Sequence, residues 1–158
     1  LWDEADQAFG ALDLKLEVLL STPGLREKGL PPHRVALSHA AHLYFTPAQM
    51  VAVGELWRNT GRAGETQLVP AAWVEQSCTS RTRSVYDPTR EYGLGWWVQD
   101  IGGHRACFAW GFGGQYIMVF PSRDLVVTAT SSTTVSDERH GHRAALFDLI
   151  AREILARL

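Results

Sequence analysis

The sequence has little of three features that would point to a specialised class of protein. Its 2 cysteines, Cys78 and Cys107, lie far apart and match neither a metal-binding nor a redox spacing, so two unpaired thiols are the favoured interpretation and a disulfide is the alternative. No apolar run approaches the ~18 residues that cross a membrane. Basic residues are not in excess, because 15 Lys and Arg accompany 17 Asp and Glu, and no nucleic-acid partner is implied.

What is present is typical of a folded domain. The 158 residues are 46% hydrophobic and 20% charged, with a net charge of −2. A compact chain of this length buries roughly 70% of its unfolded surface, so one domain is expected. The first residues, which include Asp3, Glu4 and Asp6, are acidic where a secretory signal peptide would be basic, and we expect no leader within the chain. The composition leaves the compartment open between cytoplasm and export.

Apolar spacings and boundary residues predict four helices. They cover residues 2–20, residues 47–59, a shorter segment that Pro70 opens, and a last segment that Ser136 caps. The second helix begins with a capping box, Thr46-Pro47-Ala48-Gln49, in which the Thr hydroxyl accepts an amide proton and Gln49 reaches back. The predicted buried stripes are Met50, Val53 and Trp57 in the second helix, and Phe147, Ile150, Ile154 and Leu158 in the last one.

Four segments have the β-branched and aromatic composition of strands. They are residues 92–98, 105–110, 116–120 and 125–131, and the turn Pro121-Ser-Arg-Asp124 reverses the chain between the last two. Residues 25–34 and 77–90 are predicted to be loops, and 35–43 is ambiguous. The pattern therefore predicts an α+β fold in which helices flank an antiparallel sheet.

The stretch from 108 to 131 is unusual because Gly111, Gly113 and Gly114 lie where a half-buried strand would place side chains. Glycine weakens a strand unless another group must approach the backbone closely. A ligand is one such group. A bulge or a sharp twist of the strand is the other interpretation, and the residues alone favour neither.

A metal site is weakly indicated by His39 and His42, which lie one helical turn apart. The pair lacks the Glu of a His-Glu-x-x-His site, and His140 and His142 belong to a different element. Ordinary polar or core histidines are the favoured interpretation. We therefore predict no metal and no cofactor.

The run AWGFGGQYIMVFPSRDLVVTATSS resembles the C-terminal sheet hairpin of the β-lactamase-related serine hydrolases, which include class C β-lactamases, penicillin-binding proteins, esterases and amide hydrolases. Upstream, YFTPAQMVAVGELWRNTGRAGETQLVPAAWVEQS and then YGLGWW are similar to the segment that precedes this hairpin. The resemblance covers residues 43–158 and implies the C-terminal part of the β-lactamase/transpeptidase-like fold. Residues 1–42 form a helix and loop with no such resemblance.

The resemblance implies hydrolysis of an ester or amide through an acyl-enzyme, with a Ser-x-x-Lys nucleophile and a Tyr-x-Asn motif. Neither motif occurs in the chain, because no Ser is followed by Lys three residues later and no Tyr by Asn two residues later. The chain alone therefore lacks the family's nucleophile and base. We expect a portion of a hydrolase that supplies one wall of the cleft.

The family's third motif, typically Lys-Thr-Gly, corresponds by position to Ala109-Trp110-Gly111. The resemblance implies that the backbone amide of Phe112 is one of two oxyanion donors, next to Trp110 and Gly111, and that Ala109, Gly113 and Gly114 contact substrate. Ala109 departs from the pattern, because it supplies neither the positive charge nor the hydrogen bond of Lys or His. An Ala-Trp-Gly triplet is more similar to the esterase and amide-hydrolase branches.

In this family the N-terminal strands pair beside the last strand before the final helix, here residues 125–131. Residues 2–20 are predicted to be helical and cannot fill that place, so we expect an open edge. The expected partner is the missing N-terminal half of the hydrolase or a second copy of the chain. The alternative hypothesis is a non-catalytic domain that keeps the sheet for binding or assembly.

Overall fold

The computed structural model describes residues 17–19, 42–132 and 141–158. The chain divides into two units, Leu1–Gln49 and Met50–Leu158, and each is described by itself. In the first unit, β1 (Glu17–Leu19) pairs antiparallel with β2 (His42–Tyr44). The predicted helix over 2–20 is therefore wrong at its last residues, because pairing with a distant segment overrides the local apolar spacing. The rest of that predicted helix, and His39, lie outside the described residues.

The second unit is built on a six-stranded antiparallel sheet in the order β10-β9-β8-β7-β6-β5. Its strands are β5 (Thr82–Arg83), β6 (Glu91–Tyr92), β7 (Trp97–Ile101), β8 (His104–Gly111), β9 (Gln115–Phe120) and β10 (Leu125–Ala129). The predicted strand 92–98 is two strands, and the predicted loop 77–90 contains β5. The sheet is therefore wider than the four strands expected, since β5 and β6 are too short to give a sequence pattern.

Glycine interrupts the sheet between β6 and β7 for a steric reason. A Cβ atom at Gly93 would lie 2.0 Å from the backbone oxygen of Ser77, and Gly95 has a positive φ of 81°. The close approach is accompanied by a hydrogen bond, since Leu94 donates its N–H to Ser77 O at 3.1 Å. This part of the strand prediction failed because the backbone leaves the ladder to pass Ser77.

The central hairpins follow the prediction closely. Gly113 and Gly114, with φ of 85° and 88°, form the turn between β8 and β9, while Gly111 is the last residue of β8. The reversal before β10 is the short 3₁₀ helix η2 (Pro121–Arg123), which ends at Asp124 in the left-handed region with φ of 48°. Two of the three glycines in the stretch are thus required by the turn itself.

Three α-helices are described: α3 (Pro47–Arg58), α4 (Ala71–Ser77) and α5 (His142–Leu149). The capping box of α3 is confirmed, because Thr46 N donates to Gln49 Oε1 at 2.9 Å and Gln49 N donates to Thr46 Oγ1 at 3.3 Å. A small hairpin of β3 (Arg62–Ala63) and β4 (Thr66–Gln67) follows α3. No helix within the described ranges is long and apolar enough to cross a membrane.

The C-terminal helix differs from its prediction in its final turn. After α5 the chain continues as a π-helical segment, η4 (Ile150–Ile154), and a 3₁₀ segment, η5 (Leu155–Arg157). Leu155 is therefore buried, while Leu158, predicted to be on the buried stripe, is 65% exposed. The wider π turn shifts the buried face by one residue, from i+4 to i+5 after Ile150. The predicted cap, Ser136, lies outside the described residues.

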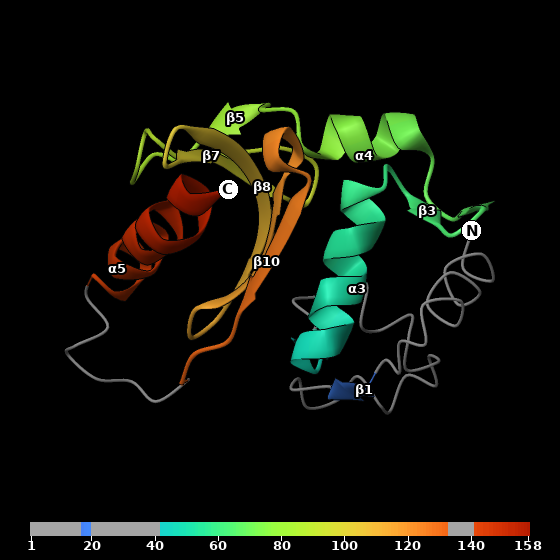
Figure 1. Ribbon diagram of the computed structural model, residues 1–158, viewed down its shortest axis with the longest axis horizontal. Helices are drawn as coiled ribbons and strands as arrows, with labels where there is room; N and C mark the ends of the chain where they lie inside the picture. Colours follow the sequence, from blue (N-terminus) through green and yellow to red (C-terminus); the bar gives the residue numbers. More distant parts are fainter. Residues whose placement is uncertain (1–16, 20–41, 133–140) are drawn as a thin grey trace. The chain divides into compact units, whose positions relative to one another are not determined.

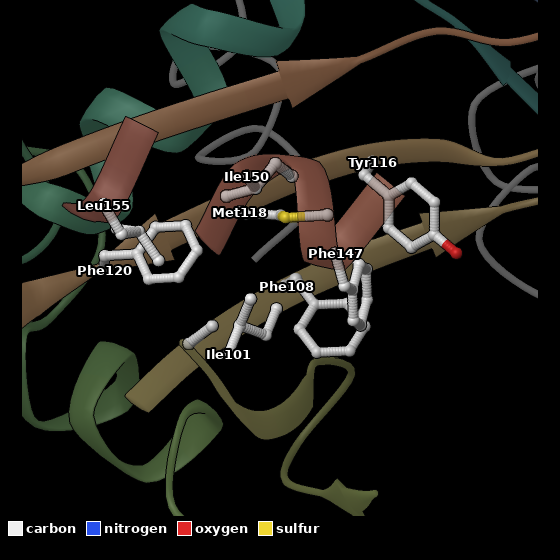
Figure 2. Close-up of a cluster of buried hydrophobic side chains, with 9 residues drawn as sticks. Ile101, Phe108, Tyr116, Met118, Phe120, Phe147, Ile150 and Leu155 are labelled. Atoms are coloured by element: carbon white, nitrogen blue, oxygen red, sulfur yellow. The ribbon is translucent and has the colours of Figure 1, made fainter. Parts of the chain in front are cut away.

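The main core lies between this helix and one face of the sheet. Phe147, Ile150 and Leu155 pack against alternate residues of the central strands, namely Phe108, Tyr116, Met118 and Phe120 (Figure 2). The ring of Phe147 meets Phe108 and Tyr116 edge to face, at centroid distances of 5.7 and 5.6 Å. In Figure 2 the Tyr116 hydroxyl points away from the other labelled side chains, so the ring belongs to the core while the hydroxyl lies at the edge of the core.

Helix α3 packs against the opposite face of the sheet, as Figure 1 shows. The contact point is Gly54, where an added Cβ atom would lie 2.4 Å from Val126 Cγ1 and 3.1 Å from Ile117 Cγ2. Of its predicted stripe, Met50 is buried, whereas Val53 and Trp57 are half-buried. Gly54 and Leu56 complete the buried face. Glycine is needed here because the helix backbone lies directly on the side chains of β9 and β10.

The two cysteines form a disulfide, which corrects the prediction of unpaired thiols. Cys78 follows α4 and Cys107 lies in the interior of β8, with their Cα atoms 5.4 Å apart. The bond closes a loop with a sequence separation of 29 residues. Spacing along the chain could not reveal it, because the fold brings the end of α4 to the sheet.

Candidate functional site

A pocket of about 310 Å³ opens at the end of the sheet where β8 turns into β9. Its lining comes from the end of β8, the glycine turn, the start of β9 and the first turn of α5. The lining residues are Trp110, Gly111, Phe112, Gly113, Gly114, Tyr116, His142 and Arg143. The Gly-rich crossing that is prominent in the sequence therefore forms one wall of an open pocket.

Five of the six predicted site residues line this pocket, and Ala109 does not. Ala109 pairs with Ile117 in the β8–β9 register, and Trp110 pairs with Tyr116. Because side chains alternate along a strand, Ala109 lies on the face that α3 covers and Trp110 on the pocket face. A contact of Ala109 with substrate would therefore have to come from its backbone.

Trp110 is the centre of an aromatic and cationic stack. Its ring is stacked on Tyr116, with centroids 6.1 Å apart and an interplanar angle of 7°, and meets Trp97 edge to face at 5.9 Å. The guanidinium carbons of Arg90 and Arg143 lie 4.9 and 5.9 Å from its ring centroid. These contacts hold the indole in one orientation while leaving it 40% exposed.

Asp87 binds both arginines. Its Oδ2 accepts from Nη2 of Arg90 at 3.0 Å and from Nη2 of Arg143 at 2.9 Å, and its Oδ1 accepts from the backbone N–H of Thr89 at 3.1 Å and from its hydroxyl. The Thr89 hydroxyl, followed by Arg143 and Arg90, lowers the pKa of the Asp87 carboxyl well below its usual range. One carboxylate thus faces two guanidinium groups, and a positive charge remains beside the pocket, at the Arg143 side chain that lines it.

Tyr116 has a second role besides packing. Burial raises the pKa of its phenol, and the nearby charges of Arg143 and Arg90 partly oppose this shift. The phenol is therefore neutral at neutral pH, and Tyr116 is one of the residues that line the pocket.

A serine and a histidine meet beside the glycine turn. Ser131 Oγ and His142 Nε2 are 2.9 Å apart, and a Cβ atom at Gly114 would lie 3.1 Å from the His142 ring and 3.3 Å from Ser131 Oγ. No sequence motif marks this pair or Arg143. The two residues are separated by 11 positions and meet only through the fold.

Metal binding receives no support from the part of the chain that the structure describes, where no group of three or more His, Cys, Asp or Glu could hold an ion. His42 lies in β2 rather than on a helix. His142 lies at the start of α5 and bonds Ser131.

Residues 5–151 match the family model described as Beta-lactamase. Because this match includes most of the chain, the chain belongs to the β-lactamase family. It is also similar to a solved structure named "Putative 6-aminohexanoate-dimer hydrolase from Bacillus anthracis", with a TM-score of 0.59 and 24% sequence identity. That likeness covers 75% of this chain and 31% of the other chain, and it shows the fold alone. No curated protein matches the chain.

These findings confirm the resemblance found in the sequence and the expected α+β fold. They also confirm the coarser functional expectation, a relative of the serine hydrolases. The chain spans under a third of the length of the solved structure that it resembles.

Proposed function

We propose that residues 43–158 act as the C-terminal part of a β-lactamase-related serine hydrolase that cleaves an ester or an amide through an acyl-enzyme. This part supplies one wall of the substrate cleft and one of the two oxyanion donors. The observation that carries the proposal is the position of residues 110–114, which line the pocket where the third family motif is expected.

The proposed oxyanion donor is the backbone amide of Phe112. Phe112 is 65% exposed, and the proposed donor belongs to its backbone, so the course of the chain around it matters more than its side chain. Gly111 ends β8 and sets the direction of the chain into the turn. Backbone donors that are fixed before the reaction stabilise the developing negative charge without reorganising.

Arg143 supplies the positive charge that Ala109 lacks. The family places Lys or His at the position of Ala109, which does not line the pocket here, whereas Arg143 lines it from the first turn of α5. Asp87 and the ring of Trp110 hold this guanidinium in place. The charge that the third motif normally provides is then delivered from another element.

The nucleophile and its base are proposed to come from the remaining part of the fold, which pairs with β10. Within the described sheet β10 has a neighbour on one side only, β9. Its two faces are covered, because Leu125 and Val127 pack on the main core and Val126 packs on Gly54. An end strand whose faces are both covered suits the addition of one further strand.

The test is co-expression of this chain with a segment of its own gene that encodes Ser-x-x-Lys and Tyr-x-Asn. We expect a defined complex that hydrolyses p-nitrophenyl esters and that a fluorophosphonate labels on the Ser of Ser-x-x-Lys. The control is the same complex with that Ser changed to Ala, which should form but not turn over. A well-formed complex without activity would instead support the non-catalytic binding or assembly domain.

A further inference from the structure

We propose that Ser131 and His142 form a second nucleophile and base, contained within this chain, that accepts an acyl group from small activated esters. This inference goes beyond the proposed function, which takes its nucleophile from elsewhere. It rests on the distance of 2.9 Å between Ser131 Oγ and His142 Nε2, which is within the range of an activated hydroxyl and its base. His142 also lines the pocket, so the pair borders a space that a substrate can enter.

The serine is held in place by a neighbouring side chain. The Gln115 side chain makes two hydrogen bonds to the backbone of Ser131. Its Nε2 donates to Ser131 O at 2.6 Å, and its Oε1 accepts from Ser131 N at 3.4 Å. This bridge extends the β9–β10 ladder beyond its last pair, Tyr116 with Ala129. The backbone of Ser131 is thereby held two residues beyond the end of β10.

The histidine is positioned from the opposite side of the turn. It is the first residue of α5, whose later residues Phe147 and Ile150 are anchored in the main core. Gly114 leaves room for the pair, because any side chain there would contact both His142 and Ser131 Oγ. The segment after β10, the glycine turn and α5 therefore converge on one hydroxyl.

The chemistry is a simple acyl transfer. With the imidazole proton on Nδ1, Nε2 accepts the proton of Ser131 as Oγ attacks the ester carbonyl and the bond from Oγ to carbon forms. The tetrahedral intermediate then expels the phenolate or alkoxide, which takes the proton from Nε2. The products are acyl-Ser131 and the free phenol or alcohol, so no co-reactant is needed.

The lining indicates the class of acyl donor. Trp110 and Phe112 expose aromatic surface at the pocket, at 40% and 65%. An ester with a small acyl group and an aromatic leaving group places its ring against these side chains. We therefore assign short p-nitrophenyl esters, and fluorophosphonates as their trapping analogues, to the Ser131–His142 pair.

The experiment treats the purified chain with a fluorophosphonate and with p-nitrophenyl acetate, then maps the modified residue by peptide mass spectrometry. The expected result is one label per chain, on Ser131. Ser131→Ala should remove it, and His142→Gln should slow labelling at least ~10²-fold, the usual contribution of a general base.

The chain carries its own matched control. Ser122 Oγ lies 3.2 Å from a ring nitrogen of His104, a similar pair that does not line the pocket. Labelling should be unchanged in Ser122→Ala and His104→Gln. Label on Ser122 at the same rate as on Ser131, or no label on Ser131 in the folded parent, would overturn the proposal.

The outcome is independent of the proposed hydrolase function. In the co-expressed complex, changing the Ser of Ser-x-x-Lys to Ala should abolish turnover while the label on Ser131 remains. A parent complex that turns over ester but carries no Ser131 label thus refutes the second site alone, and one that carries the label without turnover refutes the first alone.

Discussion

At the scale of single residues, Asp87 organises the charges beside the pocket. It lies in a stretch predicted to be a loop and no motif marks it, yet it binds Arg90 and Arg143 and so fixes two cations around Trp110. Its side chain is only 20% exposed, unlike an ordinary surface ion pair. Interactions of this kind depend on which segments meet in space, and sequence patterns do not report them.

Asp87→Asn should destabilise the fold. Each hydrogen bond to a charged group contributes about 1.5–3 kcal/mol to the free energy of unfolding. Two of the hydrogen bonds at Asp87 come from the guanidinium groups of Arg90 and Arg143, which are partly buried. We expect a loss of that order in the free energy of unfolding, measured by urea denaturation with tryptophan fluorescence. Asp100→Asn is the control, because the Asp100 side chain is 69% exposed and its contact with Arg105 is 3.7 Å, so a change within about 0.5 kcal/mol is expected.

The same variant has a pH signature. Since the folded-state pKa of Asp87 is depressed, its contribution is fully present above the unfolded value of ~3.9 and is lost as pH falls toward the folded pKa. The stability difference between parent and Asp87→Asn should therefore be constant near neutral pH and shrink below about pH 4. A difference that stays constant to pH 2 would contradict the ion-pair assignment.

At the scale of elements, the packing of α3 on the sheet depends on the close approach at Gly54. Figure 1 shows α3 alongside β10, and the nearest atoms around Gly54 belong to Val126 and Ile117. This contact covers one face of β10, the face opposite the main core. We propose that β10 pairs with an added strand along its edge. It therefore stabilises β10 without closing its edge.

Gly54→Ala should be destabilising although alanine is the better helix former. The new Cβ would lie 2.4 Å from Val126 Cγ1, and overpacking of this kind costs typically about 1–3 kcal/mol, more than the ~1 kcal/mol gained in helix propensity. Thermal unfolding followed by circular dichroism measures it. Val126→Ala in the same chain should relieve the clash, so a double variant that is as unstable as the sum of the singles would show that this contact is not the cause.

Most elements could be predicted because their signals are local. The capping box of α3, the turn at Pro121 and the alternation of β8, β9 and β10 all lie within short segments. The failures have a different origin. The disulfide, the β5–β6 extension and the π turn after Ile150 each arise from tertiary proximity or packing. The pocket residues His142 and Arg143 were missed for the same reason.

At the scale of the whole molecule, the glycine turn and β10, the end strand of the described sheet, belong to one sheet. The proposed cleft wall and the proposed pairing surface are therefore connected by β9, which contacts both. In the proposed enzyme, strand addition at β10 would support the wall that carries Gly111 and Phe112. The main core under Trp110 and Tyr116 gives this wall a rigid base.

The most direct measurement of the central claim is kcat of the co-expressed enzyme with Gly111→Val, compared with Phe112→Ala. A Cβ at Gly111 would lie 3.3 Å from Gln115 Cβ, and Val adds two methyl groups at this tight contact, so we expect the end of β8 before Phe112 to shift. Losing one oxyanion donor should lower kcat on the order of 10²- to 10³-fold, about 3–4 kcal/mol.

Phe112→Ala is the matched control, because it trims an exposed ring and keeps the amide, and it should alter KM more than kcat. The account predicts a large loss of kcat in Gly111→Val and a small one in Phe112→Ala. A Gly111→Val enzyme that folds normally by circular dichroism and keeps kcat within a few fold of the parent would contradict it.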